Sequence, residues 1–326
     1  MKTPLYNEHI AAGAKMVAYN GWEMPLQYSG ILAEHAAVRE RAGIFDASHM
    51  GEIFISGAGA PDYLQRLLTG DMRRLETRSW VYSPMCGESG GTIDDMIVYR
   101  YGEGFLLCVN AANTAKDFAW IRQNAPCSVS VSDVSDDFAL IALQGPGFAE
   151  VSDQADLSAV LLKANTGYTG ERGCELFAAP ADAPKLWREL TAAGAVPCGL
   201  GARDTLRTEA ALPLYGHELS GDISPTEAGL GRFVCFEKGG FIGRDALLKK
   251  PSRCLIGLKM QSRAVPRAGC EVRPGGIVTS GGVAPSLGYN IAMALVPGES
   301  DSYTVIIRGK EEPAETVDLP FYRRSE

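Results

Sequence analysis

Apolar residues recur with a helical period over much of the first 250 residues. In the range 30–42 they are spaced as one face of a helix, and Gly43 follows as a typical helix end. A further amphipathic helix is predicted to begin at Pro61. Similar stripes predict helices over the ranges 114–124, 183–193 and 202–212. Short apolar runs typical of strands fill the ranges 52–56, 97–101, 104–110, 128–132 and 138–143.

The connections between these elements favour one fold class. Only Gly102 and Glu103 separate the runs 97–101 and 104–110, which predicts an antiparallel hairpin. Helices mixed with hairpins favour an α+β fold over a doubly wound parallel sheet. The sequence has no glycine-rich dinucleotide fingerprint and no P-loop.

The hydrophobic pattern changes near residue 250. Helical periodicity disappears, and short alternating runs are separated by Gly, Pro and Ser. These runs are 254–260, 276–279, 291–296 and 303–307. They predict a small all-β barrel or sandwich. We therefore expect a body over residues 1–248 and a C-terminal β-barrel over 249–326, joined at Lys249-Lys250-Pro251-Ser252.

Composition and charge exclude several classes of function. The 326 residues are 46% hydrophobic and 21% charged, as in ordinary globular proteins. A net charge of −8 disfavours a general role on nucleic acid or a membrane surface. The eight cysteines form no CxxC pair and the four histidines show no metal-ligand spacing, so we expect a reduced, cytoplasmic protein without a metal. The first residues contain no apolar segment of the kind found in signal peptides, and no apolar stretch reaches 18 residues, so we expect neither a signal peptide nor a membrane span.

A glycine turn at residues 90–95 carries the first candidate site. Two glycines precede Thr92 and Ile93, and two adjacent carboxylates, Asp94 and Asp95, open an apolar β-branched strand. Strand neighbours point to opposite faces, so only one of the two carboxylates is expected to face a given cleft. We choose Asp94. The alternative is a pair that only stabilises the turn, since Asp is a favoured turn residue.

Two further stretches combine glycines with charged side chains. Residues 165–177 hold three glycines in seven residues, and Glu175 is expected at the start of the following strand. A carboxylate there could accept hydrogen bonds from the planar N–H edge of a pterin or purine, or it could be a solvated hairpin residue. Arg203 begins a helix after two glycines, where it could bind an anionic or polar group or pair with internal carboxylates such as Asp204.

The stretch Phe45 to Glu52 contains His49 and Met50. His49 has no partner Cys or Ser at a recognisable spacing, so we interpret it as structural rather than as a general base. Met50 could pack against a flat ligand or belong to the core.

Taken together, these stretches resemble the aminomethyltransferase family, the T-protein of the glycine cleavage system. The resemblance spans most of the chain through the shared order of short motifs. These motifs are 3–6, 21–28, 45–52, 90–95, 167–170, 201–204, 278–281 and 319–322.

The resemblance implies two interwoven α/β folate-binding subdomains and a C-terminal β-barrel. It implies transfer of a methylene group from an aminomethyl-lipoyl carrier, the H-protein, to tetrahydrofolate, with release of ammonia. Asp94 falls on the family's catalytic aspartate, expected to orient the folate amines. The resemblance also implies a set of folate-contacting residues, which are Glu175, Arg203, Tyr168, Tyr82, Asn110, Met50 and Tyr322.

Departures from the family pattern leave two alternatives. Arg232 stands where the family commonly has Trp, and the region between Pro266 and Gly275 is short, so the barrel is expected to be shortened. A folate-dependent O- or S-demethylase on the same scaffold therefore remains an alternative. A non-catalytic relative that assists iron–sulfur assembly is disfavoured, because Gly240 stands where that group has a cysteine.

Overall fold

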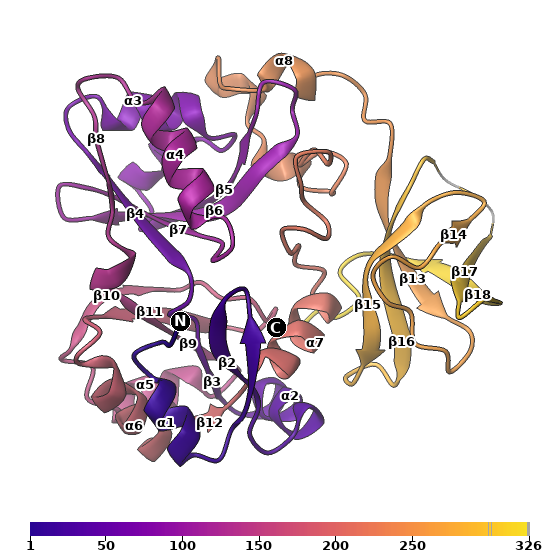
Figure 1. The fold of residues 1–326 in the computed structure, drawn as a ribbon, viewed down its shortest axis with the longest axis horizontal. Helices are drawn as coiled ribbons and strands as arrows, with labels where there is room; N and C mark the ends of the chain where they lie inside the picture. The colour runs from indigo at the N-terminus through magenta and orange to yellow at the C-terminus, as the bar shows by residue number, and fades with distance from the viewer. Residues whose placement is uncertain (299, 301, 325–326) are drawn as a thin grey trace.

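Three lobes arranged around a common centre make up the computed structural model, which describes residues 1–298, 300 and 302–324 (Figure 1). The first lobe holds strands β4–β8 with helices α3 and α4. The second holds strands β1–β3 and β9–β12 with helices α1, α2, α5, α6 and α7. The third is the β-barrel of strands β13–β18.

The first lobe is a five-stranded antiparallel sheet in the order β5-β6-β7-β4-β8. Its elements are β4 (Gly51–Ser56), α3 (Ala60–Leu67), β5 (Trp80–Cys86), β6 (Thr92–Tyr101), β7 (Gly104–Val109), α4 (Thr114–Asn124) and β8 (Ser130–Asp133). A core that includes Leu64, Leu67, Met96 and Val98 is buried between the sheet and the helices. Burial of this apolar surface is the main force that holds the lobe together.

The second lobe is built on the sheet β10-β11-β9-β3-β12. Its strands are β1 (Lys15–Tyr19), β2 (Trp22–Gln27), β3 (Gly43–Asp46), β9 (Ala139–Gln144), β10 (Val160–Ala164), β11 (Gly173–Ala178) and β12 (Val196–Pro197). Its helices are α1 (Tyr6–Ala11), α2 (Ile31–Glu40), α5 (Phe148–Gln154), α6 (Ala183–Ala192) and α7 (Leu200–Glu209). Strands β1 and β2 form a separate hairpin.

The chain crosses between these two lobes, and their sheets share a core. It leaves the second lobe after β3, completes the first lobe, and returns at β9. Side chains from both sheets meet there, and the rings of Tyr99 (β6) and Phe177 (β11) lie edge to face with centroids 5.2 Å apart. The two lobes are therefore interwoven, because the second lobe is built from chain segments on both sides of the first.

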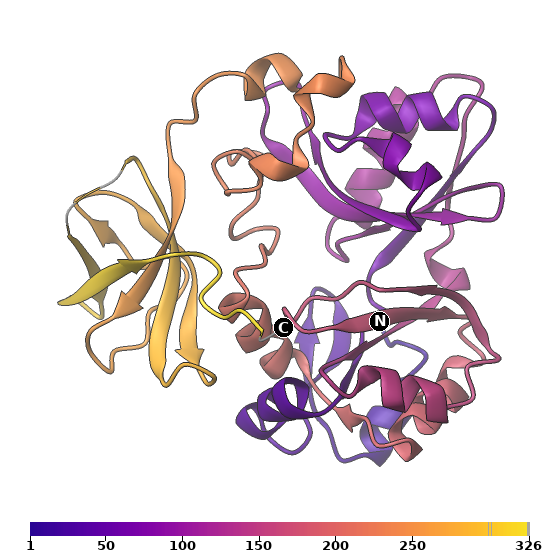
Figure 2. The same ribbon diagram turned by 180° about the vertical axis from the view of Figure 1, so that it is seen from behind.

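The barrel is a six-stranded antiparallel sheet in the order β14-β17-β18-β13-β16-β15. Its strands are β13 (Cys254–Met260), β14 (Val272–Arg273), β15 (Ile277–Ala284), β16 (Tyr289–Val296), β17 (Tyr303–Ile307) and β18 (Lys310–Val317). It is reached through residues 213–253, which pass the first lobe and include the short helix α8 (Arg244–Leu247) (Figure 2).

The α+β class, the interwoven body and the β-barrel predicted from the sequence are confirmed, and so is the β6–β7 hairpin. Most predicted element bounds agree with the structure to within three residues, and α7 begins at Leu200 instead of 202. Two strands are longer than predicted, because β6 begins at Thr92, five residues before the predicted run, and β15 ends at Ala284, five residues after it. The division at residues 248 and 249 stays a prediction. Among the described residues, no helix combines the length and the apolar character needed to cross a membrane.

Candidate active site

Strand β6 presents Asp94 and Asp95 on opposite faces. Asp94 is fully buried and lies on the same face as Met96 and Val98, toward the core of the first lobe. Asp95 is half-buried and lies on the face of Tyr99, toward the second lobe. The sequence analysis chooses Asp94 as the carboxylate that faces a cleft, but the alternation of the strand turns Asp94 toward the core of the first lobe and Asp95 toward the neighbouring lobe.

Asp94 is enclosed by N–H donors. Its Oδ1 accepts hydrogen bonds from Asn110 Nδ2 at 2.8 Å and from Asn113 Nδ2 at 2.7 Å. Its Oδ2 accepts one from the backbone N–H of Asn110 at 3.0 Å. Hydrogen bonds of this kind satisfy the oxygens of a buried carboxyl group in place of water. Asp94 therefore fixes the chain after β7 against β6.

Asp95 is held by two neighbours on the inter-lobe face. Its Oδ2 accepts a hydrogen bond from the Tyr82 hydroxyl at 2.9 Å, and its Oδ1 accepts one from Asn110 Nδ2 at 3.0 Å. Burial first, and then the charge of Asp94, raise the pKa of Asp95 to about 7. A carboxyl group that gains and loses a proton near neutral pH is suited to general acid–base chemistry.

Backbone packing fixes the start of β6. The N–H of Thr92 donates to Ser220 O at 2.9 Å and to Ile223 O at 3.1 Å, and the Thr92 hydroxyl also donates to Ile223 O. A Cβ atom on Gly91 would lie 1.8 Å from Gly221 O, so only glycine permits this approach. The glycines of the turn thus let residues 220–223 hold the strand that carries both aspartates.

Glu175 lies within β11 and is only 7% exposed. Its Oε2 accepts hydrogen bonds from the Tyr99 hydroxyl at 2.9 Å and from the Thr166 hydroxyl at 2.5 Å. Its Oε1 accepts no hydrogen bond from the described residues, so one lone-pair edge of this nearly buried carboxylate is left for a ligand. The prediction that Glu175 begins the strand is wrong by two residues, since β11 starts at Gly173.

Tyr168 and Arg203 form a second part of the site. The Arg203 guanidinium lies over the Tyr168 ring, 4.7 Å from its centroid, and makes no hydrogen bond within the described part of the chain. The Tyr168 hydroxyl donates to Pro213 O at 2.5 Å. Burial raises the pKa of Tyr168, whose ring therefore stays neutral. Arg203 is thus a half-buried cation with all its donors available.

The turn between β3 and β4 carries Met50 and His49. Met50 is half-buried against the inter-lobe core. His49 is buried and lies edge to face with Tyr19 at 5.8 Å. Burial and the nearby Arg203 charge lower the pKa of His49 to about 4, so its ring is neutral at pH 7. This environment does not favour a general-base role for His49.

Tyr322 contacts a different set of residues from those around Asp95 and Glu175. Its ring packs 3.8 Å from the Arg39 guanidinium, and its backbone N–H donates to Glu209 O at 2.8 Å. It lines a cavity of about 540 Å³ between α2 and the β15–β16 turn. The structure therefore associates Tyr322 with the junction of the barrel and the second lobe.

Several residues of the site carry no signal that the sequence analysis detected. Asn113, Tyr99 and Thr166 bind the acidic groups, and Phe233 packs edge to face on Tyr82 with centroids 4.7 Å apart. Arg232, which departs from the family pattern, is exposed and lies over the Phe233 ring at 4.8 Å. The Asn113 and Tyr99 roles follow from strand register and helix phase, which short motifs do not report.

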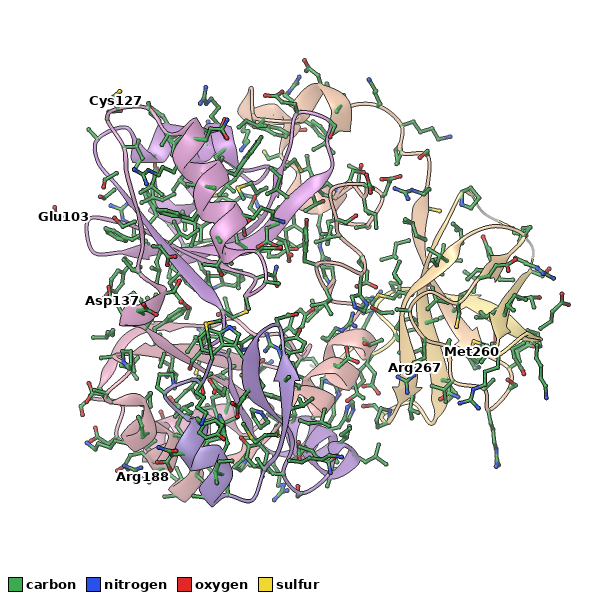
Figure 3. The ribbon with its side chains drawn as sticks, in the orientation of Figure 1. Glu103, Cys127, Asp137, Arg188, Met260 and Arg267 are labelled. Atoms are coloured by element: carbon green, nitrogen blue, oxygen red, sulfur yellow. The ribbon has the colours of Figure 1, made fainter. Side chains whose placement is uncertain are left out.

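The cysteine close to this group is Cys108 on β7, which is buried in the inter-lobe core beside Tyr99, where burial raises the pKa of its thiol. Cys127, the exposed cysteine, is at the outer edge of the first lobe, as its label in Figure 3 shows. No group of three His, Cys, Asp or Glu side chains in the described residues could hold a metal ion.

Comparison with known proteins identifies the family. Residues 5–238 match the GCVT N-terminal domain, and residues 253–323 match the glycine cleavage T-protein C-terminal barrel domain. An aminomethyltransferase of Moorella thermoacetica is 51% identical over 361 aligned positions, covering 99% of this chain and 98% of that protein. The Rubrobacter xylanophilus aminomethyltransferase is 48% identical, covering 99% and 94% respectively.

The fold agrees with a solved structure of the same family. The crystal structure of glycine cleavage system aminomethyltransferase T from Bartonella henselae superimposes with a TM-score of 0.90 at 35% identity. The superposition covers 99% of this chain and 98% of that one. The resemblance stated from the sequence motifs is confirmed, and the chain belongs to the glycine cleavage T-protein family of aminomethyltransferases.

Proposed function

We propose that this chain transfers the methylene group of an aminomethyl-lipoyl carrier protein to tetrahydrofolate and releases ammonia. Family membership supports the reaction. The observation that carries the proposal is Asp95, a carboxyl group on the inter-lobe face that is held by Tyr82 and Asn110 and has its pKa raised to about 7.

The residues around Asp95 are chemically suited to a folate. Glu175 offers an unpaired carboxylate oxygen to the amine and ring N–H donors of a pterin. Arg203 offers free guanidinium donors to carbonyl or carboxylate oxygens. Met50, Tyr82 and Tyr168 supply half-buried apolar and aromatic surface for a flat ring. Tyr322 is a less direct candidate for a folate contact, because its ring packs on Arg39 at the junction with the barrel.

Tetrahydrofolate supplies two amines, N5 and N10, that together lose two hydrogens as they bond the methylene carbon. The lipoyl sulfur gains one of these hydrogens and the departing nitrogen gains the other, so the transfer needs no oxidant. We propose that Asp95, in its ionised form, accepts a proton from a folate amine and then passes that proton on. Asp94 was chosen from the sequence as the catalytic aspartate. Its complete burial and its three donors favour a supporting role instead.

The aminomethyl group arrives on a second protein. The natural donor of the proposed reaction is a lipoylated carrier, the H-protein of glycine cleavage. The family assignment supports this partner. The relatives described above are aminomethyltransferases, which favours this donor over the methyl ethers and thioethers of a demethylase.

Residues 238–244 align with the cysteine motif of the iron–sulfur assembly relatives, and they do not support such a role here. Gly240 is exposed and carries no thiol. The preceding Lys238 instead donates to the backbone oxygens of Gln65 and Gly70, both at 2.7 Å, and also to Leu68 O. Lys238 thus closes the C-terminal end of α3, which is a structural role.

A labelled donor tests the proposed function. Purified protein is mixed with tetrahydrofolate and a lipoylated carrier whose aminomethyl carbon is ¹³C, and the label is followed by NMR. We expect the label in 5,10-methylenetetrahydrofolate and an equal amount of ammonia. Folic acid, whose N5 carries no hydrogen, is the control and should accept no label. Absence of labelled folate with both substrates present would refute the proposal.

A further inference from the structure

Asp117 is a buried acid that the proposed reaction does not use. It lies in the first turns of α4 and is 0% exposed. Both of its carboxyl oxygens are covered, and neither accepts a hydrogen bond from an N–H or O–H donor of the described residues. An isolated carboxylate in such a place would lose its hydration without compensation. A neighbouring group must therefore stabilise the carboxyl group of Asp117.

The group next to Asp117 is Asp94. Asn113 lies one helical turn before Asp117, whose backbone N–H donates to Asn113 O at 2.8 Å, so the two side chains share a face of α4. The Asn113 side chain donates to Asp94 Oδ1 at 2.7 Å. This face of α4 is therefore directed at the buried side of β6, where Asp94 lies.

The nearby donors and the nearby cation are directed to other groups, so a negative charge on Asp117 would not be compensated by a hydrogen bond or an ion pair. The three N–H hydrogen bonds from Asn110 and Asn113 are accepted by Asp94, and Asp117 accepts none of them. The Lys116 ammonium donates elsewhere, to Ile93 O at 2.5 Å and to the Tyr215 hydroxyl at 2.9 Å. Two adjacent buried carboxyl groups without a cation share a proton rather than both ionise.

We propose that Asp117 is a positioning residue that retains its proton, donates it in a hydrogen bond to Asp94, and so fixes Asp94 and Asn110 behind Asp95. The inference rests on the proposed function, in which Asp95 handles the proton. The proposed order of contacts is Asp117 to Asp94, Asp94 to Asn110, and Asn110 to Asp95.

The charges around the pair agree with this assignment. Burial, followed by the hydrogen bond and the charge of Asp94, raises the pKa of Asp117 to about 10. Of the other charged groups that act on Asp117, Asp95 on β6 raises its pKa, and Lys116 on its own helix lowers it without outweighing burial and Asp94. The remaining strands packed against α4 carry Glu52 on β4 and Asp133 on β8, and burial, followed by the charge of Asp133, raises the pKa of Glu52.

The same arrangement links Asp117 to the acidity of Asp95. The charge of Asp94 contributes to the raised pKa of Asp95. A donor on Asp117 holds the Asp94 side chain in its place close to Asp95. Removal of that donor should let Asp94 move away from Asp95 and shift the titration of Asp95 to lower pH.

Two substitutions separate this role from simple packing. Asp117→Leu keeps the branching of the side chain at Cγ and removes the donor, although leucine is larger, whereas Asp117→Asn keeps an N–H donor toward Asp94. In Asp117→Leu we expect kcat to fall by about tenfold to a hundredfold, as for a misplaced catalytic group, with KM for tetrahydrofolate unchanged. Asp117→Asn should rescue most of the lost turnover.

Two readouts do not depend on turnover. Infrared difference spectra of the wild type against Asp117→Asn at pH 8 should contain the C=O band of a neutral carboxylic acid. Carboxyl ¹³C NMR, assigned with Asp95→Asn, should show the Asp95 titration at lower pH in Asp117→Leu than in the wild type.

The outcomes separate this inference from the proposed function. Absence of the neutral-acid band would overturn the inference, and that result needs no folded Leu variant. An unchanged Asp95 titration in a folded Asp117→Leu protein would also overturn it. Failure of the wild type to transfer the methylene group would instead refute the proposed function, while the two spectroscopic readouts would still decide the role of Asp117.

Discussion

At the scale of single residues, the strand geometry of β6 gives two identical side chains different environments. Asp94 is enclosed by three N–H donors, whereas Asp95 has two donors, a half-buried position and a pKa raised to about 7. Reactivity in acid–base catalysis depends on access and on a pKa near the working pH. Both criteria favour Asp95 as the group that acts on substrate.

Asp95→Asn and Asp94→Asn form a matched pair that tests this assignment. Asp95→Asn retains the size of the side chain and removes its basic oxygen, so kcat should fall by about 10²- to 10⁴-fold, the usual range for general acid–base groups. The KM for tetrahydrofolate should stay close to that of the wild type. Steady-state kinetics of both variants measure the effect. A larger loss in Asp94→Asn than in Asp95→Asn would return the catalytic role to Asp94.

Glu175→Gln tests the proposed pterin contact. The substitution keeps the shape of the side chain and removes the charge that would strengthen a hydrogen bond to a pterin donor. Tetrahydrofolate binding should weaken by about 1.5–3 kcal/mol, the typical contribution of a charged hydrogen bond. Isothermal titration calorimetry measures this, with the exposed Glu150→Gln as control. Equal affinities in the two variants would place the pterin away from Glu175.

At the scale of elements, the approach of residues 220–223 to the start of β6 determines where both aspartates lie. Thr92 receives its hydrogen-bond partners from that segment, and Gly91 touches its backbone. The segment is far from β6 in sequence, so the position of the site depends on a long-range backbone contact.

Gly91→Ala should disturb this contact, and Gly87→Ala is the control. The new Cβ of Gly91→Ala would overlap Gly221 O, at a distance of 1.8 Å, and the backbone must move to relieve it. We expect a loss of about 1–3 kcal/mol in the free energy of unfolding and a lower kcat. A Cβ on Gly87 would meet only Ile93 Cδ1, at 3.9 Å. Urea denaturation of both variants measures the difference, and equal stabilities would disprove the packing argument.

Local sequence patterns predicted most elements, whereas the environment of each site residue depends on tertiary contacts that those patterns do not report. Helices α2, α4 and α6 follow from their apolar stripes, and the β6–β7 hairpin follows from its turn. The choice between Asp94 and Asp95 depended on which face of β6 is covered by α4, and a strand sequence with apolar residues on both faces does not report that. Asp117 could not be predicted as a partner, because its proximity to Asp94 arises from the docking of α4 on the sheet.

At the scale of the whole molecule, a buried ionic cluster joins the barrel to the second lobe. Arg39 on α2 pairs with Glu171 and with Glu209, both at 2.9 Å. Glu209 also accepts a hydrogen bond from the backbone N–H of Ser286, in the β15–β16 turn, at 2.8 Å. Since Tyr322 packs on the same Arg39 guanidinium, the C-terminal segment is held by this cluster as well.

Glu209→Gln tests the contribution of the cluster to stability. It leaves the buried Arg39 partly uncompensated, so the free energy of unfolding should fall by about 3–5 kcal/mol at pH 7. Hydrogen bonds and ion pairs to His35, Ser286 and Arg39 outweigh burial and lower the pKa of Glu209 to about 2 from its usual 4.5.

The pH dependence of that loss has a definite sign. A lowered pKa in the folded state stabilises the protein above the pKa of the unfolded chain, and this stability is lost as the pH falls. The difference between the wild type and Glu209→Gln should therefore be complete at pH 6 and shrink as the pH falls below about 4.5. Urea denaturation at several pH values measures it. The exposed pair of Lys259 and Glu315 provides the control, and Glu315→Gln should change stability by less than about 1 kcal/mol. A pH-independent difference for Glu209→Gln would contradict the assignment.

The most direct test of the proposed transfer is a single turnover with the protein in excess over the aminomethyl-lipoyl carrier and with saturating tetrahydrofolate. Samples quenched over time are analysed for methylenetetrahydrofolate and ammonia. The proposed function predicts that both products form in equal amounts and with the same rate constant, and that Asp95→Asn slows both together. Ammonia released without methylenetetrahydrofolate, or a carrier that keeps its aminomethyl group, would contradict it.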